Sequence, residues 1–109
     1  MSIQLIDQKD LAGGDLEGYL FGSSVSVIFQ RDTAPGFRVR LHRHPYDETF
    51  LVRSGRALFT VGDERIEAAG GQILVAPAHT PHQFEVIGPE PYEGVHIHAA
   101  PRFETEWLE

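Results

Sequence analysis

Three side chains near the middle of the chain have the types and the spacing of metal ligands. His42 and His44 are two residues apart, and Glu48 follows four residues later. Alternate residues of an extended strand point to the same face, so the two imidazoles can reach one point. Pro45 predicts a bend after them, which lets Glu48 join them with the same parity. Two imidazoles and a carboxylate that converge form the beginning of a divalent transition-metal site.

Composition limits what this site and its partners can be. The 109 residues include no cysteine, so any metal must be held by nitrogen and oxygen atoms. The formal net charge of −7 argues against a nucleic-acid or anionic membrane partner, which would need a basic face. No apolar run reaches the roughly 18 residues of a spanning helix, and no signal peptide is visible. We therefore expect a cytoplasmic protein with one domain over residues 1–109.

Strand patterns dominate the rest of the chain. Short runs rich in Val, Ile, Phe and Thr alternate with Gly and Pro clusters, which is typical of an all-β sandwich or barrel. We expect strands at residues 24–31, 37–44, 48–53, 56–61, 64–67, 72–76, 82–87 and 92–98. Helix patterns are weak, and residues 103–109 fit a turn of helix or a final strand equally.

A two-residue turn at Ser54-Gly55 would join its flanking strands as a hairpin. One face of this hairpin would carry Glu48 together with apolar residues only, namely Phe50, Val52, Ala57, Phe59 and Val61. A buried carboxylate needs a partner, because its uncompensated burial is very costly. A metal ion would supply that partner.

A fourth candidate ligand lies on a later strand. His82 shares one face of the strand at 82–87 with Phe84 and Val86, while Gln83 and Glu85 lie on the other face. A single metal-capable side chain again stands on an apolar face.

The spacing of these residues resembles that of the cupin superfamily. The first cupin motif is matched by Gly36, His42, His44, Glu48 and Gly55, and most of the second by Gly71, Pro77 and His82. The resemblance implies a small single-domain cupin with its motif region at 36–86. Its fold would be all-β, a double-stranded β-helix or jelly-roll β-barrel. The implied ligands are His42, His44, Glu48 and His82, which would hold one divalent transition metal such as Fe, Mn, Zn or Ni.

Two positions depart from the cupin pattern. His79 stands where the second motif has a glycine, and Val86 replaces its final asparagine. The glycine position lies in a tight turn, and histidine tolerates left-handed backbone better than bulkier residues do. Neither change touches a ligand.

Two arginines precede the first motif histidine. Arg38 and Arg40 have the parity of the ligands, so a regular strand would aim them into the barrel mouth. There they would bind an anionic or carbonyl-bearing ligand. A local change of register would instead make them surface residues.

A second His-x-His pair lies near the end of the chain. His96 and His98 share one face of the strand at 92–98 and either line the pocket or support a metal ligand. The alternative is an exposed face, with Val95 and Ile97 packed inward. Phe50, Phe59 and Phe84 are further candidate substrate-binding residues that would keep the cavity dry.

The opposite face of the expected strands is also apolar. Its residues are Phe37, Val39, Leu41, Leu51, Leu58, Val25, Val27 and Phe29. An exposed patch of this kind marks a partner surface, and small cupins commonly pair, so we expect a homodimer.

Three functions fit a metal with open coordination positions. The first is a dioxygenase-like oxygenase that acts on a small organic acid, a diketone or a phenolic compound. The second is a non-catalytic binding or regulatory cupin, and the third a metal-dependent isomerase, lyase or cyclase. No general base stands out in the sequence.

Overall fold

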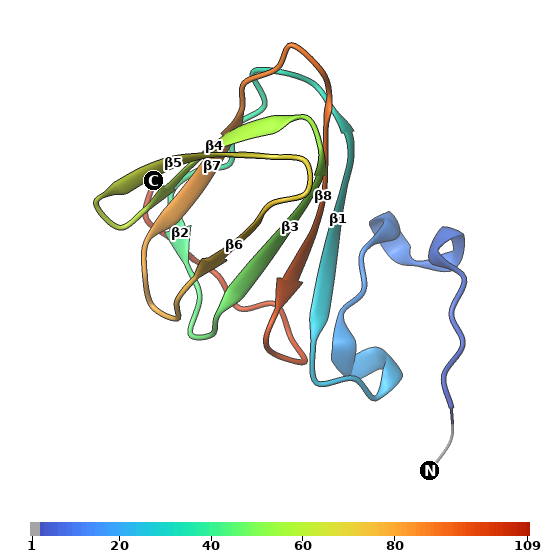
Figure 1. Ribbon diagram of the computed structural model, residues 1–109. Coiled ribbons are helices and arrows are strands. Elements are labelled where there is room, and N and C mark those ends of the chain that lie inside the picture. Colours follow the sequence, from blue (N-terminus) through green and yellow to red (C-terminus); the bar gives the residue numbers. More distant parts are fainter. Residues whose placement is uncertain (1–2) are drawn as a thin grey trace.

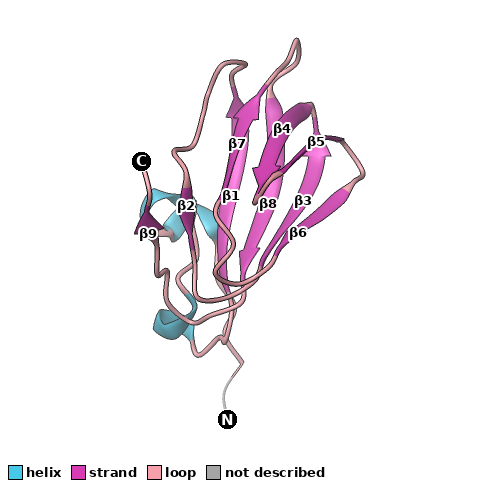
Figure 2. Cartoon of the chain, turned by 90° about the vertical axis from the view of Figure 1, so that its left-hand side faces the viewer, coloured by secondary structure: helices cyan, strands magenta, loops and turns pink. Residues whose placement is uncertain are grey.

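Two antiparallel sheets face each other in the computed structural model, which describes residues 3–109 (Figures 1 and 2). The first two residues of the expected 1–109 domain lie outside the described residues. The first sheet contains, in order, β1 (Ser26–Thr33), β8 (Tyr92–His98), β3 (Glu48–Ser54) and β6 (Ile73–Ala76). The second contains, in order, β5 (Glu64–Ala69), β4 (Arg56–Val61), β7 (His82–Val86), β2 (His42–Arg43) and β9 (Glu106–Trp107). The predicted all-β, double-stranded β-helix or jelly-roll fold is confirmed.

The core lies between the two sheets. The alternation of buried and exposed residues along β3 and β7 sends every second side chain inward. The buried cluster consists of Phe50, Val52, Ala57, Phe59, Ala68, Ala76, Phe84, Val86 and Tyr92. These apolar side chains pack next to the polar site inside the barrel.

The segment before β1 lies along the outside of the barrel. It forms three short 3-10 helices, η1 (Gln8–Asp10), η2 (Ala12–Gly14) and η3 (Gly18–Phe21), which Figure 1 shows beside β1. An isolated bridge between Leu16 and Val27 ties it to that strand. Within residues 3–109, no helix is long and apolar enough to cross a membrane.

The expected hairpin at Ser54-Gly55 is wrong. β3 and β4 belong to different sheets, so the chain crosses between the layers at this point. Gly55 makes the crossing with φ 75°, and a Cβ there would clash with the backbone of Pro91. Glu48 is therefore paired with Ala76 and His98, not with the β4 residue Val61. The inward face was nevertheless predicted correctly, because both strands line the same core.

The expected strand at 37–44 is also interrupted. Arg38 forms an isolated bridge with Glu85, and regular pairing resumes only at β2. Between these points, the carbonyl of Arg40 accepts a hydrogen bond from Nδ1 of His42 at 2.7 Å. The backbone thus bonds to a side chain where a continuous strand would bond to its neighbour.

Candidate metal centre

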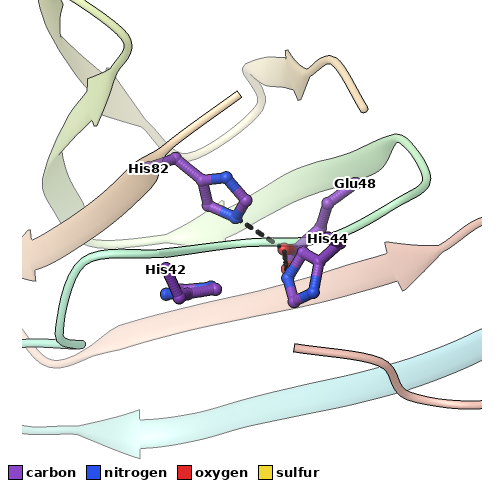
Figure 3. A group of neighbouring side chains, drawn as sticks. All are labelled: His42, His44, Glu48 and His82. Carbon is purple, nitrogen blue, oxygen red and sulfur yellow. Dashed lines mark hydrogen bonds and ion pairs between the residues drawn. The ribbon is translucent and has the colours of Figure 1, made fainter. Parts of the chain in front are cut away.

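The two sheets bring the four predicted ligands together in the barrel interior (Figure 3). His42 of β2 pairs directly with His82 of β7 in one sheet. Glu48 is the first residue of β3 in the other sheet, and His44 lies on the connection from β2 to β3. All four are buried, and one ligand atom of each lies within 4.8 Å of the others.

Hydrogen bonds fix the orientation of the three imidazoles. In each ring Nδ1 lies against a backbone carbonyl oxygen, at 2.7 Å from Arg40 for His42, 2.8 Å from Glu104 for His44 and 2.9 Å from Thr80 for His82. Because a carbonyl only accepts, Nδ1 must carry a proton in all three rings. Nε2 is then the atom available to a metal, which is the usual arrangement of ligating histidines.

The carboxylate lies among these rings. Oε1 of Glu48 is 3.0 Å from Nε2 of His44 and 3.1 Å from Nε2 of His82. Burial acts to raise the pKa of Glu48, but hydrogen bonds from His44 and His82 and the nearby ring of His98 outweigh it and hold the pKa far below its usual range. Glu48 is therefore ionised, as a metal ligand must be.

Burial also keeps a ligand imidazole neutral. It lowers the pKa of His42 from its ordinary value to about 4, and the nearby rings of His82 and His44 act in the same direction. A neutral imidazole is the form that coordinates metals. The donor types, their convergence and their charges together fit one divalent transition ion.

A cavity of about 160 Å³ opens beside the four ligands. Its walls are mostly apolar and include Phe50 and Phe84, as predicted. Phe59 does not line it. That ring lies behind the wall in the buried core, 4.9 Å from the ring of Phe50 and 5.5 Å from the ring of Phe84, measured between centroids. Its contribution to the cavity is to support these two rings.

Of the two placements that the sequence left open for Arg38 and Arg40, the structure has the one on the surface. Val39 lines the cavity, and both arginines are exposed. Arg38 forms an ion pair with Glu109 at 3.0 Å, and Arg40 stacks over the ring of Trp107 at 4.4 Å from its centroid. Because the strand is interrupted after Val39, the side chain that points inward before His42 is Val39 and not an arginine. Val39 therefore does not belong to the expected outer apolar patch.

His96 and His98 both lie in the cavity wall and are buried. Of the two arrangements that the sequence left open, the structure has the inward one, while Val95 and Ile97 are half-buried. Nε2 of His96 bonds to the hydroxyl of Tyr92 at 2.9 Å, and burial lowers the pKa of His96 to about 4. His98 lies beside the candidate ligands, with Nε2 at 3.2 Å from Oε2 of Glu48.

Sequence reasoning missed the part of the wall formed by the last residues. Phe103, Thr105 and Trp107 line the cavity, and the ring of Trp107 lies 5.1 Å from that of His42. Trp107 belongs to β9, which pairs with β2. The alternate spacing of these three residues was the available signal, since alternate residues of a strand share a face.

The substituted glycine position behaves as expected. His79 has φ 66°, in the left-handed region, and its N–H donates to the carbonyl of His44 at 2.7 Å. The turn that precedes β7 therefore keeps its place without a glycine. This turn contacts the backbone of the candidate ligand His44.

Comparisons with known proteins agree with this architecture. A family model described as the cupin domain matches residues 30–98, which is more than half of the chain. An uncharacterised protein of Methanocaldococcus jannaschii is 35% identical over 57 residues, covering 51% of this chain and 46% of that protein. The chain spans less than half the length of the curated relatives it matches.

Two solved structures are similar in fold. An uncharacterised protein of Klebsiella pneumoniae with a double-stranded β-helix domain has a TM-score of 0.66 and 28% identity, over 78% of this chain and 73% of that one. An oxalate decarboxylase of Lactobacillus farciminis, solved as a formate complex, has a TM-score of 0.76 and 21% identity, over 86% of this chain and 30% of that one. Because its family model, its sheet topology and its motif residues agree, the chain belongs to the cupin domain family.

Proposed function

We propose that the protein binds one divalent transition metal and is a dioxygenase-like oxygenase of a small organic acid, diketone or phenolic compound. The observation that carries the proposal is the convergence of three imidazoles and one carboxylate within 4.8 Å beside a small, mostly apolar cavity. When bound, the ion supplies Lewis acidity and open coordination positions. Fe, Mn, Zn and Ni all accept this set of nitrogen and oxygen donors.

The charges at the site favour an anionic substrate. Glu48 is the only acidic residue among those that line the cavity, and no lysine or arginine lines it. A divalent ion with one carboxylate and neutral imidazoles leaves a net positive charge in an apolar interior. An uncompensated charge there is costly, so a substrate that brings a negative charge to the metal is favoured.

The size of the cavity restricts the substrate further. Its volume of about 160 Å³ equals that of roughly five water molecules at about 30 Å³ each. Sites for drug-sized ligands are larger, at about 300–1,000 Å³. A small acid or diketone therefore fits better than an extended molecule.

The apolar wall has a part in the proposed chemistry. Phe50 and Phe84 exclude water from the ligand side of the cavity, and Trp107 covers the ring of His42. Electrostatic interactions between a charged centre and a substrate are stronger in such a site than in water. His96 and His98 offer ring nitrogens to polar atoms of the substrate.

Arg38 and Arg40 do not bind an enclosed substrate directly in this proposal. Neither Arg38 nor Arg40 lines the cavity, so an enclosed ligand would not touch them. Arg40 stacks on Trp107, whose ring does line the cavity. We therefore propose that Arg40 positions this wall, and that Arg38 would contact only a ligand that extends to the surface.

Oxygen uptake tests the proposal. Protein loaded with Fe(II) under anaerobic conditions is mixed with a 2-hydroxy acid, a β-diketone or a catechol, and then exposed to O2. Uptake stoichiometric with product supports an oxygenase, and His82→Ala should abolish it. Turnover without uptake would instead indicate an isomerase, lyase or cyclase, and tight binding without turnover a binding or regulatory protein.

We also propose a homodimer. Several large apolar side chains on the edge strands β5 and β6 are exposed, including Ile66 at 55%, Ile73 at 67% and Val75 at 53%. An exposed apolar patch favours association. Light scattering should give twice the chain mass of 12.2 kDa, and the monomer mass at micromolar concentration would contradict the proposal. The cytoplasmic location stays a prediction from the sequence.

A further inference from the structure

His98 differs from the other histidines around the centre in how its ring nitrogens are partnered. Its Nε2 lies 3.2 Å from Oε2 of Glu48, but in a direction unsuited to a hydrogen bond. Among residues 3–109, it is the one side-chain nitrogen or oxygen atom that is fully shielded from solvent and has no hydrogen-bond partner. An orphaned buried polar atom in a native site calls for an explanation.

The other ring nitrogen of His98 has a well-placed partner. Nδ1 lies 2.8 Å from the hydroxyl of Tyr46, a buried side chain. The same hydroxyl oxygen accepts a hydrogen bond from the backbone N–H of Glu104 at 3.2 Å. Because the hydroxyl proton also needs an acceptor, and Nδ1 is the one within reach, we assign Tyr46 as the donor to His98.

This assignment reverses the tautomer of His98 relative to the three ligand histidines. Their Nδ1 atoms donate to carbonyls and leave Nε2 for a metal. In His98, Nδ1 accepts from Tyr46, so the proton of the neutral ring lies on Nε2 and faces Glu48. The side chain that looks like a fifth ligand therefore presents an N–H group to the carboxylate of Glu48.

The two oxygens of Glu48 have separate surroundings. Oε1 faces Nε2 of His44 and of His82, on the ligand side. Oε2 faces His98. The cross-strand register of Glu48 and His98, which pair directly between β3 and β8, maintains this division.

We propose that His98 is a positioning residue of the metal centre: held by Tyr46, it directs its Nε2 proton toward Oε2 of Glu48, 3.2 Å away, and leaves Oε1 as the single carboxylate ligand atom. The stacking of Tyr46 on His44, with their ring planes 6° apart, ties the same tyrosine to a ligand ring. The inference rests on the proposed metal centre and does not depend on which reaction it carries out.

Nitrogen NMR of the zinc-loaded protein tests the tautomer directly. At 12.2 kDa the chain suits long-range proton–nitrogen correlation spectra, which distinguish the two neutral tautomers of each histidine. We expect a protonated Nδ1 and a metal-shifted Nε2 for His42, His44 and His82. For His98 we expect a protonated Nε2 without a metal shift. A protonated Nδ1 or a metal-bound Nε2 in His98 would overturn the inference.

Metal affinity provides the second test. His98→Leu removes the donor and should weaken Zn²⁺ and Co²⁺ binding roughly 10- to 100-fold, the usual effect of losing a partner of a ligand. His98→Gln places an amide donor near the position of Nε2 and should restore most of the affinity. Val52→Ala removes buried side-chain atoms from the strand of Glu48, outside the cavity lining, and should leave the affinity unchanged.

The visible spectrum of the Co²⁺ protein adds a readout of coordination that a loss of packing alone would not change. A changed spectrum in His98→Leu with recovery in His98→Gln supports the inference. Equal affinity and equal spectra for the wild type and His98→Leu would refute it and leave the proposed function intact. If the wild type bound no metal, both the proposed function and this inference would be wrong.

Discussion

Replacing His82 with alanine should uncouple the stability of the protein from metal binding. His82 is buried at 3% exposure, and its Nε2 lies on the ligand side of Glu48. Loss of a residue that only supports a ligand typically costs about 10- to 100-fold in metal affinity. Loss of a ligand itself should cost at least about 100-fold.

The size of the effect follows from linkage. A ligand present at 100 times its Kd stabilises the folded state by about 2.7 kcal/mol. For a chain of 109 residues, an unfolding entropy of about 2.1 cal/mol/K per residue gives about 0.23 kcal/mol/K. The wild-type Tm should therefore rise by about 12 °C. With the Kd raised about 100-fold, His82→Ala should gain only about 0.4 kcal/mol, or about 2 °C.

The assay is thermal unfolding with and without Zn²⁺, and only the metal-induced shift is compared because the substitution also lowers the baseline Tm. His79→Asn is a matched control. This exposed histidine lies in a left-handed turn that asparagine accommodates, so the variant should keep the full shift. Equal shifts in His82→Ala and the wild type would refute the assigned ligand set.

Three further predictions concern pH, protons and the crossing between sheets. The buried His96 has a pKa lowered to about 4 from 6.5, so the unfolded chain takes up its proton first as the pH falls. The stability that its neutral form gives is complete above pH 6.5 and should decrease by about 2 kcal/mol by pH 5. Denaturant unfolding with chelator present should show this loss, and His96→Leu should show less of it. The two imidazoles that meet Glu48 have an acceptor at each ring nitrogen, so metal binding should release protons. Calorimetry in buffers of different ionisation enthalpy measures this release, and buffer-independent heats would contradict it. Gly55→Ala should destabilise the protein by more than the roughly 1–2 kcal/mol expected of left-handed alanine, because its Cβ meets the Pro91 backbone. Gly71→Ala, with φ 92° and open space around the new Cβ, should cost only the strain, and equal losses would contradict the close packing at the crossing.

The convergence of the four candidate ligands was predictable because it depends on local spacing. The i, i+2 spacing of His42 and His44 correctly predicted that their rings converge, although only His42 lies within a strand. Glu48 and His82 also lie on apolar inward faces as predicted, because the alternation of side chains along β3 and β7 is a local property. These patterns need no knowledge of which strands pair.

Pairing between strands was the part that local patterns could not supply. Ser54-Gly55 fits a tight hairpin and a crossing between sheets equally well, because both need a residue with positive φ. For a similar reason, the parity of Arg40 could not decide between its inward and its surface placement. Its carbonyl bonds to the ring of His42, and the chain leaves the strand there, which no propensity of the residues indicates.

The partners of His98 depend on the same long-range register. Its position opposite Glu48 follows from the pairing of β3 with β8, and its bond to Tyr46 joins residues 52 positions apart. The sequence identified the residue as a candidate and left its neighbours open. The structure adds the tautomer, and with it a specific role.

The metal content of the protein as purified without added chelator tests the central claim most directly. Elemental analysis of the wild type and His82→Ala, side by side, gives the number of ions per chain. The account predicts close to one transition-metal ion per wild-type chain and a large reduction in the variant. A wild-type protein that contains none, and takes up none from equimolar Fe(II), Mn(II), Zn(II) or Ni(II), would contradict it.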